Sequence, residues 1–166
     1  KKGKLFWITG LSGSGKTTLS KKITPYIRKR FGPTLLISGD DMRDIFNLVG
    51  YDKKSRLSYG LSFNKLSKFL TDQGINVIFN VIGMYNLVRK KNRSLIKNYI
   101  EIYIESELSE IERKGIKKIY RGNKKNIVGR DIKPQLPKSP DVVIKNDFTK
   151  NTNDLAKELI KKIESL

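Results

Sequence analysis

The chain has 166 residues, of which 35 are Lys or Arg and 16 are Asp or Glu, so its formal net charge is +19. This charge excludes a neutral scaffold and predicts a polyanionic partner: nucleic acid, anionic lipid or a phosphorylated small molecule. Cysteine and histidine are both absent. Disulfides, thiolate nucleophiles and imidazole bases are thereby excluded, and any chemistry depends on carboxylates, hydroxyls, amines, backbone amides or a bound ion.

The hydropathy pattern contains no apolar run close to the roughly 20 residues that a membrane span requires. The basic first residues lead into a glycine-rich turn instead of a long apolar stretch. We therefore expect a soluble, cytoplasmic protein with no membrane partner. The sequence shows neither an internal repeat nor a low-complexity linker, so we expect residues 1–166 to form a single domain.

The chain begins with alternating strands and helices. A short apolar run over residues 4–9 predicts a buried strand, which leads into a glycine-rich segment at 10–15 and then into apolar side chains at helical spacing. Gly32 and Pro33 are expected to end this helix, and residues 34–38 predict a second buried strand.

The middle of the chain continues the alternation. A long helix is predicted over residues 53–72, followed by a third strand over 76–81, a basic helical segment over about 85–99 and a fourth strand over 101–104. Strands that alternate with helices pair in parallel through right-handed crossovers. The sequence therefore predicts an α/β fold in which a parallel sheet of about five strands is sandwiched between helices.

The segment over residues 113–130 differs from the rest, because it holds eight basic residues and no acidic one. This charge predicts a mobile, cationic lid over about 113–133 that closes over phosphates; a solvated surface of a lysine-rich chain is the alternative. Residues 141–144 then predict a fifth strand, and the chain ends in an amphipathic helix with Asn151 or Thr152 as its expected cap.

The glycine-rich segment matches the phosphate-binding pattern G-x-x-x-x-G-K-[ST] and lies between a predicted strand and a predicted helix. In this motif backbone N–H groups and the helix N-terminus bind phosphates, the lysine reaches the β- and γ-oxygens, and the hydroxyl ligates Mg²⁺. A plain glycine turn before a surface lysine is the alternative, which the flanking elements disfavour. ATP and Mg²⁺ are therefore the expected cofactors. The residues expected to bind ATP are Gly10, Ser12, Gly13, Ser14, Gly15, Lys16, Thr17 and Thr18.

Two classes of nucleotide-dependent protein are disfavoured by motifs that the sequence lacks. A guanine-specific switch would show Asn-Lys-x-Asp after a strand, and the strings at 64–67 and 123–126 lack the Asp. A motor ATPase usually has an apolar strand that ends in Asp, whereas the third strand ends at Asn80 and Val81.

An acidic pair, Asp40 and Asp41, follows the second predicted strand, on the sheet edge that carries the phosphate loop. Asp40 is the candidate base, or a ligand of metal-bound water, since no histidine is available; a helix-capping carboxylate is the alternative. Arg43 lies one turn further on, where its guanidinium can bind an anion. We therefore expect Asp40 and Lys16 to be catalytic, and Thr17 and Asp40 to hold the metal.

An ordered set of short motifs continues beyond the glycine loop. It comprises Ser38-Gly-Asp-Asp-Met-Arg43, Asn47, Gly50-Tyr51, Arg56, Lys114-Gly115, Lys125-Asn-Ile-Val-Gly129 and Pro137-x-x-Pro140-Asp141. With these motifs the chain resembles adenylylsulfate kinases over nearly its whole length. The resemblance implies a P-loop kinase that transfers the γ-phosphate of ATP to the ribose 3′-hydroxyl of a nucleotide with an acidic, diphosphate-like 5′ end.

By position, the resemblance gives the donor phosphates and Mg²⁺ to Lys16 and Thr17, the 3′-hydroxyl to Asp40, and the anionic end of the acceptor to Arg43 and Arg56. Arg121 of the lid is expected to bind ATP as well. The other residues expected to bind the acceptor are Tyr51, Tyr59, Ile82, Gly83, Lys125 and Ile127. The resemblance also allows a homodimer, since family members are often dimers.

The departures from the family pattern fall on acceptor contacts. The family's Asn-Ile-Arg-Arg is Tyr-Gly-Leu-Ser at residues 59–62, and its Ile-Ser-Pro-Tyr-Arg is Ile-Gly-Met-Tyr-Asn at 82–86. Two phenylalanines that sandwich the acceptor's adenine align with Tyr51 and Ile127, and an aliphatic side chain stacks less well than an aromatic one. This pattern fits a changed acceptor better than a changed reaction. We expect cytidine diphosphoramidate, a nucleotide used in decorating bacterial capsules, with adenylylsulfate as the alternative.

A basic nucleic-acid-binding module is the alternative of another class, because a charge of +19 can follow a phosphate backbone. Tyr120 is the only aromatic residue between Arg113 and Arg130. The usual stacking platform for bases is therefore missing, and nucleic acid is not the expected partner.

Overall fold

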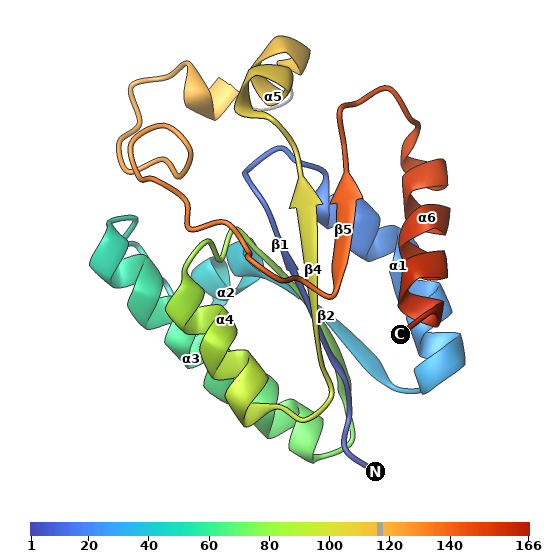
Figure 1. The fold of residues 1–166 in the computed structure, drawn as a ribbon. Helices are drawn as coiled ribbons and strands as arrows, with labels where there is room; N and C mark the ends of the chain where they lie inside the picture. Colours follow the sequence, from blue (N-terminus) through green and yellow to red (C-terminus); the bar gives the residue numbers. More distant parts are fainter. Residues whose placement is uncertain (116–117) are drawn as a thin grey trace.

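A computed structural model gives the structure of the protein and describes residues 1–115 and 118–166. Its centre is a five-stranded sheet with the order β2-β3-β1-β4-β5, in which all neighbouring strands are parallel (Figure 1). The strands are β1 (Leu5–Thr9), β2 (Thr34–Ser38), β3 (Asn76–Val81), β4 (Tyr99–Glu105) and β5 (Val142–Lys145). Every residue of β1 and β3 is buried, as expected for parallel strands with helices on both faces.

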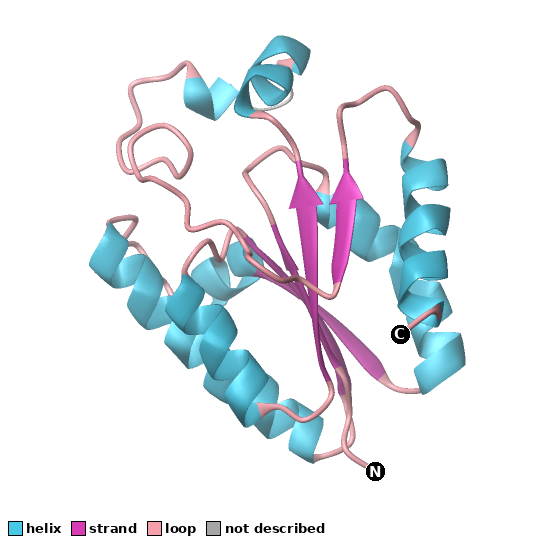
Figure 2. Cartoon of the chain, in the orientation of Figure 1, coloured by secondary structure: helices cyan, strands magenta, loops and turns pink. Residues whose placement is uncertain are grey.

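Helices cover both faces of this sheet (Figure 2). They are α1 (Lys16–Phe31), α2 (Gly39–Ile45), α3 (Lys53–Asp72), α4 (Asn86–Leu95), α5 (Leu108–Lys114), the 3₁₀ helix η1 (Lys118–Tyr120) and α6 (Thr152–Glu164). Figure 1 shows α1 and α6 on one face of the sheet and α3 and α4 on the other. The predicted α/β sandwich is confirmed.

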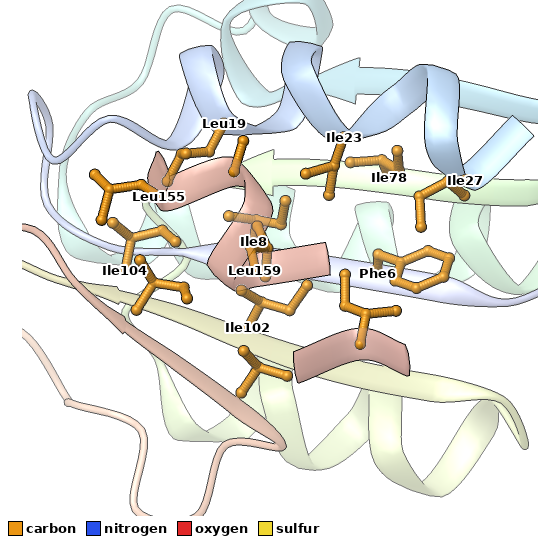
Figure 3. Close-up of a cluster of buried hydrophobic side chains, with 14 residues drawn as sticks. Phe6, Ile8, Leu19, Ile23, Ile27, Ile78, Ile102, Ile104, Leu155 and Leu159 are labelled. Carbon is orange, nitrogen blue, oxygen red and sulfur yellow. The ribbon is translucent and has the colours of Figure 1, made fainter. Parts of the chain in front are cut away.

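The apolar face of each layer packs into a separate core. Between the sheet and the α1–α6 pair, Leu19 and Ile23 of α1 meet Ile8 of β1 and Leu159 of α6 (Figure 3). On the other face Trp7 forms part of a second cluster with α3 and α4. Both cores are apolar and almost fully buried, and they fix the positions of the strand ends.

The carboxyl ends of the strands lie along one edge of the sheet, and the loops that follow the strands line this edge. β1 leads into the phosphate loop, β2 into α2, β3 into residues 82–85 and β5 into residues 146–151. Residues 118–133 lie over this edge (Figure 1). They pack there through a third apolar cluster that includes Leu11, Tyr120 and Ile127.

The predicted elements agree with the structure with a few exceptions. The strand over 34–38 was predicted to be buried, but β2 lies at the edge of the sheet and only Thr34 is buried in it. Helix α2 was not predicted. The basic helix ends at Leu95 and not near residue 99, because Tyr99 pairs with Leu5 and begins β4. Helix α5 was not predicted, and its last turn contains the start of the lid. Of the lid, residues 116–117 lie outside the described residues. Asn151 is the cap of α6, since its side chain accepts from the Asp154 N–H. Among the described residues, no helix is long and apolar enough to cross a membrane.

Candidate active site

The phosphate loop, residues 10–15, joins β1 to α1 and requires glycine at three positions. Gly13 and Gly15 have φ values of 85° and 98°, in the left-handed region that other residues rarely adopt. A Cβ atom on Gly10 would lie 2.6 Å from the carbonyl oxygen of Ile104. The three glycines therefore permit a tight loop at the start of α1, as the motif predicts.

Lys16 and Thr17 occupy the first turn of α1, where the helix adds a partial positive charge. The Lys16 ammonium donates to the Leu11 carbonyl oxygen at 2.6 Å, so its side chain lies back along the loop and is buried. Thr17 is exposed at the edge of a cavity. Both residues line this cavity, and their contacts to a triphosphate and its metal ion stay predictions.

This cavity has a volume of about 670 Å³, a size typical of a small-molecule site. It extends from the phosphate loop across the carboxyl ends of β1 and β3 to helices α2 and α3. Most of the residues predicted from the sequence line it: Ser12, Gly13, Gly15, Lys16, Thr17, Thr18, Asp40, Arg43, Arg56, Tyr59, Ile82 and Gly83. The fold thus brings the predicted donor side and the predicted acceptor side to one cavity.

Asp40 lies in the first turn of α2, exposed on the cavity wall. The N-cap of this helix is Ser38, whose hydroxyl accepts from the Asp41 N–H at 3.0 Å while the Asp41 carboxylate accepts from the Ser38 N–H at 3.1 Å. This capping box satisfies the helix start without Asp40. The capping hydrogen bonds of α2 are therefore made by Ser38 and Asp41, and Asp40 is left exposed on the cavity wall.

Arg43 is held against the loop that joins α2 to α3. One of its terminal nitrogens donates to the carbonyl oxygens of Leu48 and Gly50, at 2.7 and 2.9 Å. Its guanidinium carbon also lies 4.1 Å from the centre of the Tyr51 ring and 5.3 Å from that of Tyr59. These contacts fix the orientation of the cation beside the cavity.

Arg56 joins helix α3 to the lid. Its guanidinium donates to the Tyr51 carbonyl oxygen at 2.7 Å and to the Asn126 carbonyl oxygen at 3.1 Å. Burial lowers the pKa of Arg56, and the nearby positive charge of Arg43 lowers it further. Two guanidinium groups that repel each other on one cavity wall favour an anionic ligand between them.

The lid packs against the phosphate loop through Tyr120, whose hydroxyl donates to the Ser12 carbonyl oxygen at 2.8 Å. Burial is the main reason that the pKa of Tyr120 is raised to about 12. Arg130 does not face the cavity, because its guanidinium donates to the Tyr120 and Gly122 carbonyl oxygens at 3.0 and 2.8 Å. Of the lid cations with described side chains, Lys114 is the one that lines the cavity.

Six predicted ligand residues are not part of the cavity wall, and two of them, Gly10 and Ser14, are buried in the phosphate loop itself. Tyr51 is half-exposed beneath Arg43, and Arg121 and Lys125 are exposed on the lid. Ile127 is buried in the apolar cluster under the lid, and its neighbour Val128 lines the cavity instead. Their predicted contacts to nucleotide stay predictions.

Sequence reasoning missed a group of residues that follow β5 and close the donor end of the cavity: Asn146, Phe148, Lys150 and Thr152. The Asn146 amide donates to the Ser14 carbonyl oxygen at 2.9 Å and so supports the phosphate loop. The position of Asn146 at the carboxyl end of a strand was the available signal. Trp7, Asn80 and Tyr85 also line the cavity and were not singled out as ligands.

Comparisons with known proteins agree with this geometry. Residues 2–145 match the family model "Adenylylsulphate kinase". The chain belongs to the adenylylsulfate kinase family. A cytidine diphosphoramidate kinase of Campylobacter jejuni is 36% identical over 163 residues, which cover 96% of this chain and 95% of the relative. An adenylyl-sulfate kinase of Pseudomonas aeruginosa is 31% identical over 97% of this chain and 85% of its own.

A solved structure of this family has the same fold. The Mycobacterium tuberculosis APS kinase in complex with AMPPNP and APS superimposes with a TM-score of 0.85, at 25% identity, and each chain is covered to 98%. The predicted P-loop kinase fold is thereby confirmed, and the protein is a phosphotransferase of a family that uses ATP.

The donor residues fit a nucleotide with a magnesium ion. Among residues 1–115 and 118–166 there is no group of three acidic side chains that could hold a metal by itself. In kinases Mg²⁺ usually takes one or two protein oxygens and completes its shell with phosphate oxygens and water. The Thr17 hydroxyl and the Asp40 carboxylate, both on the cavity wall, supply such oxygens.

Proposed function

We propose that this protein transfers the γ-phosphate of ATP to the ribose 3′-hydroxyl of cytidine diphosphoramidate. The observation that supports this most directly is that the phosphate loop, Asp40 and the Arg43–Arg56 pair all line one cavity. A nucleotide whose ribose lies near Asp40 has its anionic 5′ end near the two guanidinium groups. The Campylobacter jejuni kinase, similar over almost the whole chain, supports this acceptor.

The chain's residues would divide the reaction as follows. Lys16 and the phosphate loop bind the donor phosphates, and Thr17 and Asp40 would hold Mg²⁺, which would supply charge neutralisation on those phosphates. Asp40 accepts a hydrogen bond from the acceptor hydroxyl and orients it for in-line attack. Arg43 and Arg56 bind the 5′ end, and Lys114 adds positive charge at the mouth of the cavity.

Adenylylsulfate is the second candidate acceptor. The Pseudomonas aeruginosa relative supports it, and the same two arginines suit its anionic end. The residues around the acceptor favour cytidine diphosphoramidate, because Tyr59 has no side-chain amide that could bind the acceptor. Its hydroxyl instead accepts from the Gly50 N–H at 3.2 Å. The family's asparagine at this position is thus replaced by a side chain that supports the α2–α3 loop.

The test is ADP release by the purified chain with MgATP and each acceptor. We expect kcat/KM to be at least about tenfold higher for cytidine diphosphoramidate, which corresponds to ~1.4 kcal/mol of transition-state discrimination. A preference for adenylylsulfate would overturn the acceptor assignment. Turnover with neither nucleotide would overturn the proposed function.

A further inference from the structure

Asn80 occupies a central position at the carboxyl end of β3. Along the sheet it is level with Ser38 of β2 and Ile8 of β1. Asp40 lies two residues after Ser38 in the chain, and Gly10 lies two residues after Ile8. Because β3 lies between β2 and β1, Asn80 lies between the candidate base and the phosphate loop.

The side chain of Asn80 faces the α1 side of the sheet. Side chains alternate along a strand, and Ile78, two residues earlier, packs against Leu19 and Ile23 of α1. The first turn of that helix carries Lys16, and Asn80 and Lys16 line the same cavity. The carboxamide therefore points toward the end of the site where the γ-phosphate of ATP is expected.

The Asn80 side chain has no internal partner. It is 5% exposed, and within the described part of the chain no hydrogen bond joins its carboxamide to another group. Some unpartnered side-chain atoms, such as Trp7 Nε1 and Tyr85 Oη, are sealed from solvent. The two polar atoms of Asn80 are not in that group. A buried amide without a partner destabilises a fold, so a group that binds in the cavity is the expected partner.

Asn76, at the other end of β3, shows what a structural asparagine looks like in this strand. It is 3% exposed. Its amide donates to the Phe31 and Pro33 carbonyl oxygens at 3.0 and 3.1 Å, and its oxygen accepts from the Lys4 N–H at 2.9 Å. Both polar atoms of the Asn76 side chain have hydrogen-bond partners within the fold. Asn80 is therefore the buried asparagine of β3 whose side chain has no such partner.

We propose that Asn80 is a catalytic residue of the phosphoryl transfer, whose amide N–H donates to an oxygen of the γ-phosphoryl group. In the step, the bond from γ-phosphorus to the β-phosphate bridging oxygen breaks, and a bond to the acceptor's 3′-oxygen forms. The hydroxyl proton leaves through Asp40, and Asn80 neither gains nor loses a proton. A neutral donor suits this place, because a carboxylate there would repel the phosphates. The inference rests on the proposed kinase function.

The experiment compares Asn80→Ala with Asn76→Ala as its matched control. For Asn80→Ala we expect kcat to fall about 10- to 100-fold, as for loss of one hydrogen bond to a charged group, with the KM for ATP raised by up to about tenfold, the KM for the acceptor within about threefold and no loss in the thermal unfolding midpoint. For Asn76→Ala we expect a lower midpoint and an unchanged kcat. Asn80→Asp, which keeps the shape and adds charge, should lose at least as much kcat as Asn80→Ala.

A binding measurement separates this inference from the acceptor assignment. Calorimetric titration with Mg²⁺ should show that Asn80→Ala weakens AMPPNP about tenfold and ADP, which lacks the γ-phosphate, less than twofold. Equal effects on both nucleotides, or a kcat within twofold of wild type, would overturn the role of Asn80. A wild-type chain that binds AMPPNP but phosphorylates neither acceptor would overturn the proposed function, and the comparison of AMPPNP with ADP would still decide for or against the γ-phosphate contact.

Discussion

Replacing Arg89 by methionine tests how the acceptor side of the cavity is held in place. Arg89 lies on α4 and is 4% exposed, with its Nε 3.6 Å from a Glu101 carboxylate oxygen. Its terminal nitrogens donate to the Gly83 carbonyl oxygen at 3.0 Å, to the Asn86 side chain and to the Gln135 carbonyl oxygen. One buried cation thus joins the loop after β3, the segment after the lid and the sheet.

The size of the effect follows from what remains beside Glu101. Removing one partner of a buried ion pair costs about 3–5 kcal/mol, because the other charge is left buried. Glu101 keeps the Tyr99 hydroxyl at 3.0 Å and Arg93 at 3.4 Å. The loss should therefore lie near the lower end, at about 3 kcal/mol. Methionine, flexible and unbranched, fills much of the space of the lost side chain.

Urea unfolding followed by circular dichroism measures this loss. With an m value of about 1–3 kcal/mol/M, the midpoint should fall by at least about 1 M. In the native state the KM for the acceptor should rise more than the KM for ATP, because Gly83 lines the acceptor side. Glu101→Gln and the double variant complete a mutant cycle. A loss below about 1 kcal/mol, or additive single effects, would refute the coupling assigned to this pair.

Three further predictions concern the base, the lid anchor and acid stability. Asp40→Asn should lower kcat about 100-fold or more while AMPPNP binding stays within about threefold; a kcat near wild type would remove the role of Asp40 in the reaction. Tyr120→Phe should lower the free energy of unfolding by about 1 kcal/mol through its lost hydrogen bond to Ser12. Because the pKa of Tyr120 is about 12, the substitution should leave the pH–rate profile below pH 10 unchanged, and a profile altered there would contradict this assignment. Hydrogen bonds from Arg130 and Ile127 hold the pKa of Asp131 at about 2. The contribution of this carboxylate to stability is therefore complete above its ordinary pKa of about 4 and is lost as the pH falls to about 2. Acid unfolding of Asp131→Asn should be flatter over that range, and curves identical to wild type would contradict the assignment.

The sequence was sufficient wherever a local pattern determined the structure. The helix over 53–72 was predicted with its observed bounds from the spacing of its apolar residues and from Gly74 beyond its end, and in the structure Asp52 caps its start. The phosphate loop was equally clear, since its glycines are required by backbone geometry. Asp40 was found from its place after a strand, which the topology converts into a place on the cavity wall.

Features that depend on tertiary contacts were not accessible in the same way. The basic helix ends early because β1 pairs with Tyr99, a preference that helical periodicity does not contain. The buried position of Ile127 follows from Asp131, which accepts from the Ile127 N–H at 3.0 Å, and from the apolar cluster under the lid. Asn146 reaches the phosphate loop because the strand order of the sheet places β5 two strands from β1.

The central claim is that a phosphoryl group passes from ATP to the 3′-hydroxyl of a diphosphate-type nucleotide. Phosphorus NMR of the product made from MgATP and cytidine diphosphoramidate tests this claim most directly. The predicted result is one new phosphomonoester signal that couples to the ribose 3′ proton, with the two phosphorus signals of the 5′ end retained. A phosphate at the 2′ position or on the 5′ end, or ADP formed without a phosphorylated nucleotide, would contradict it.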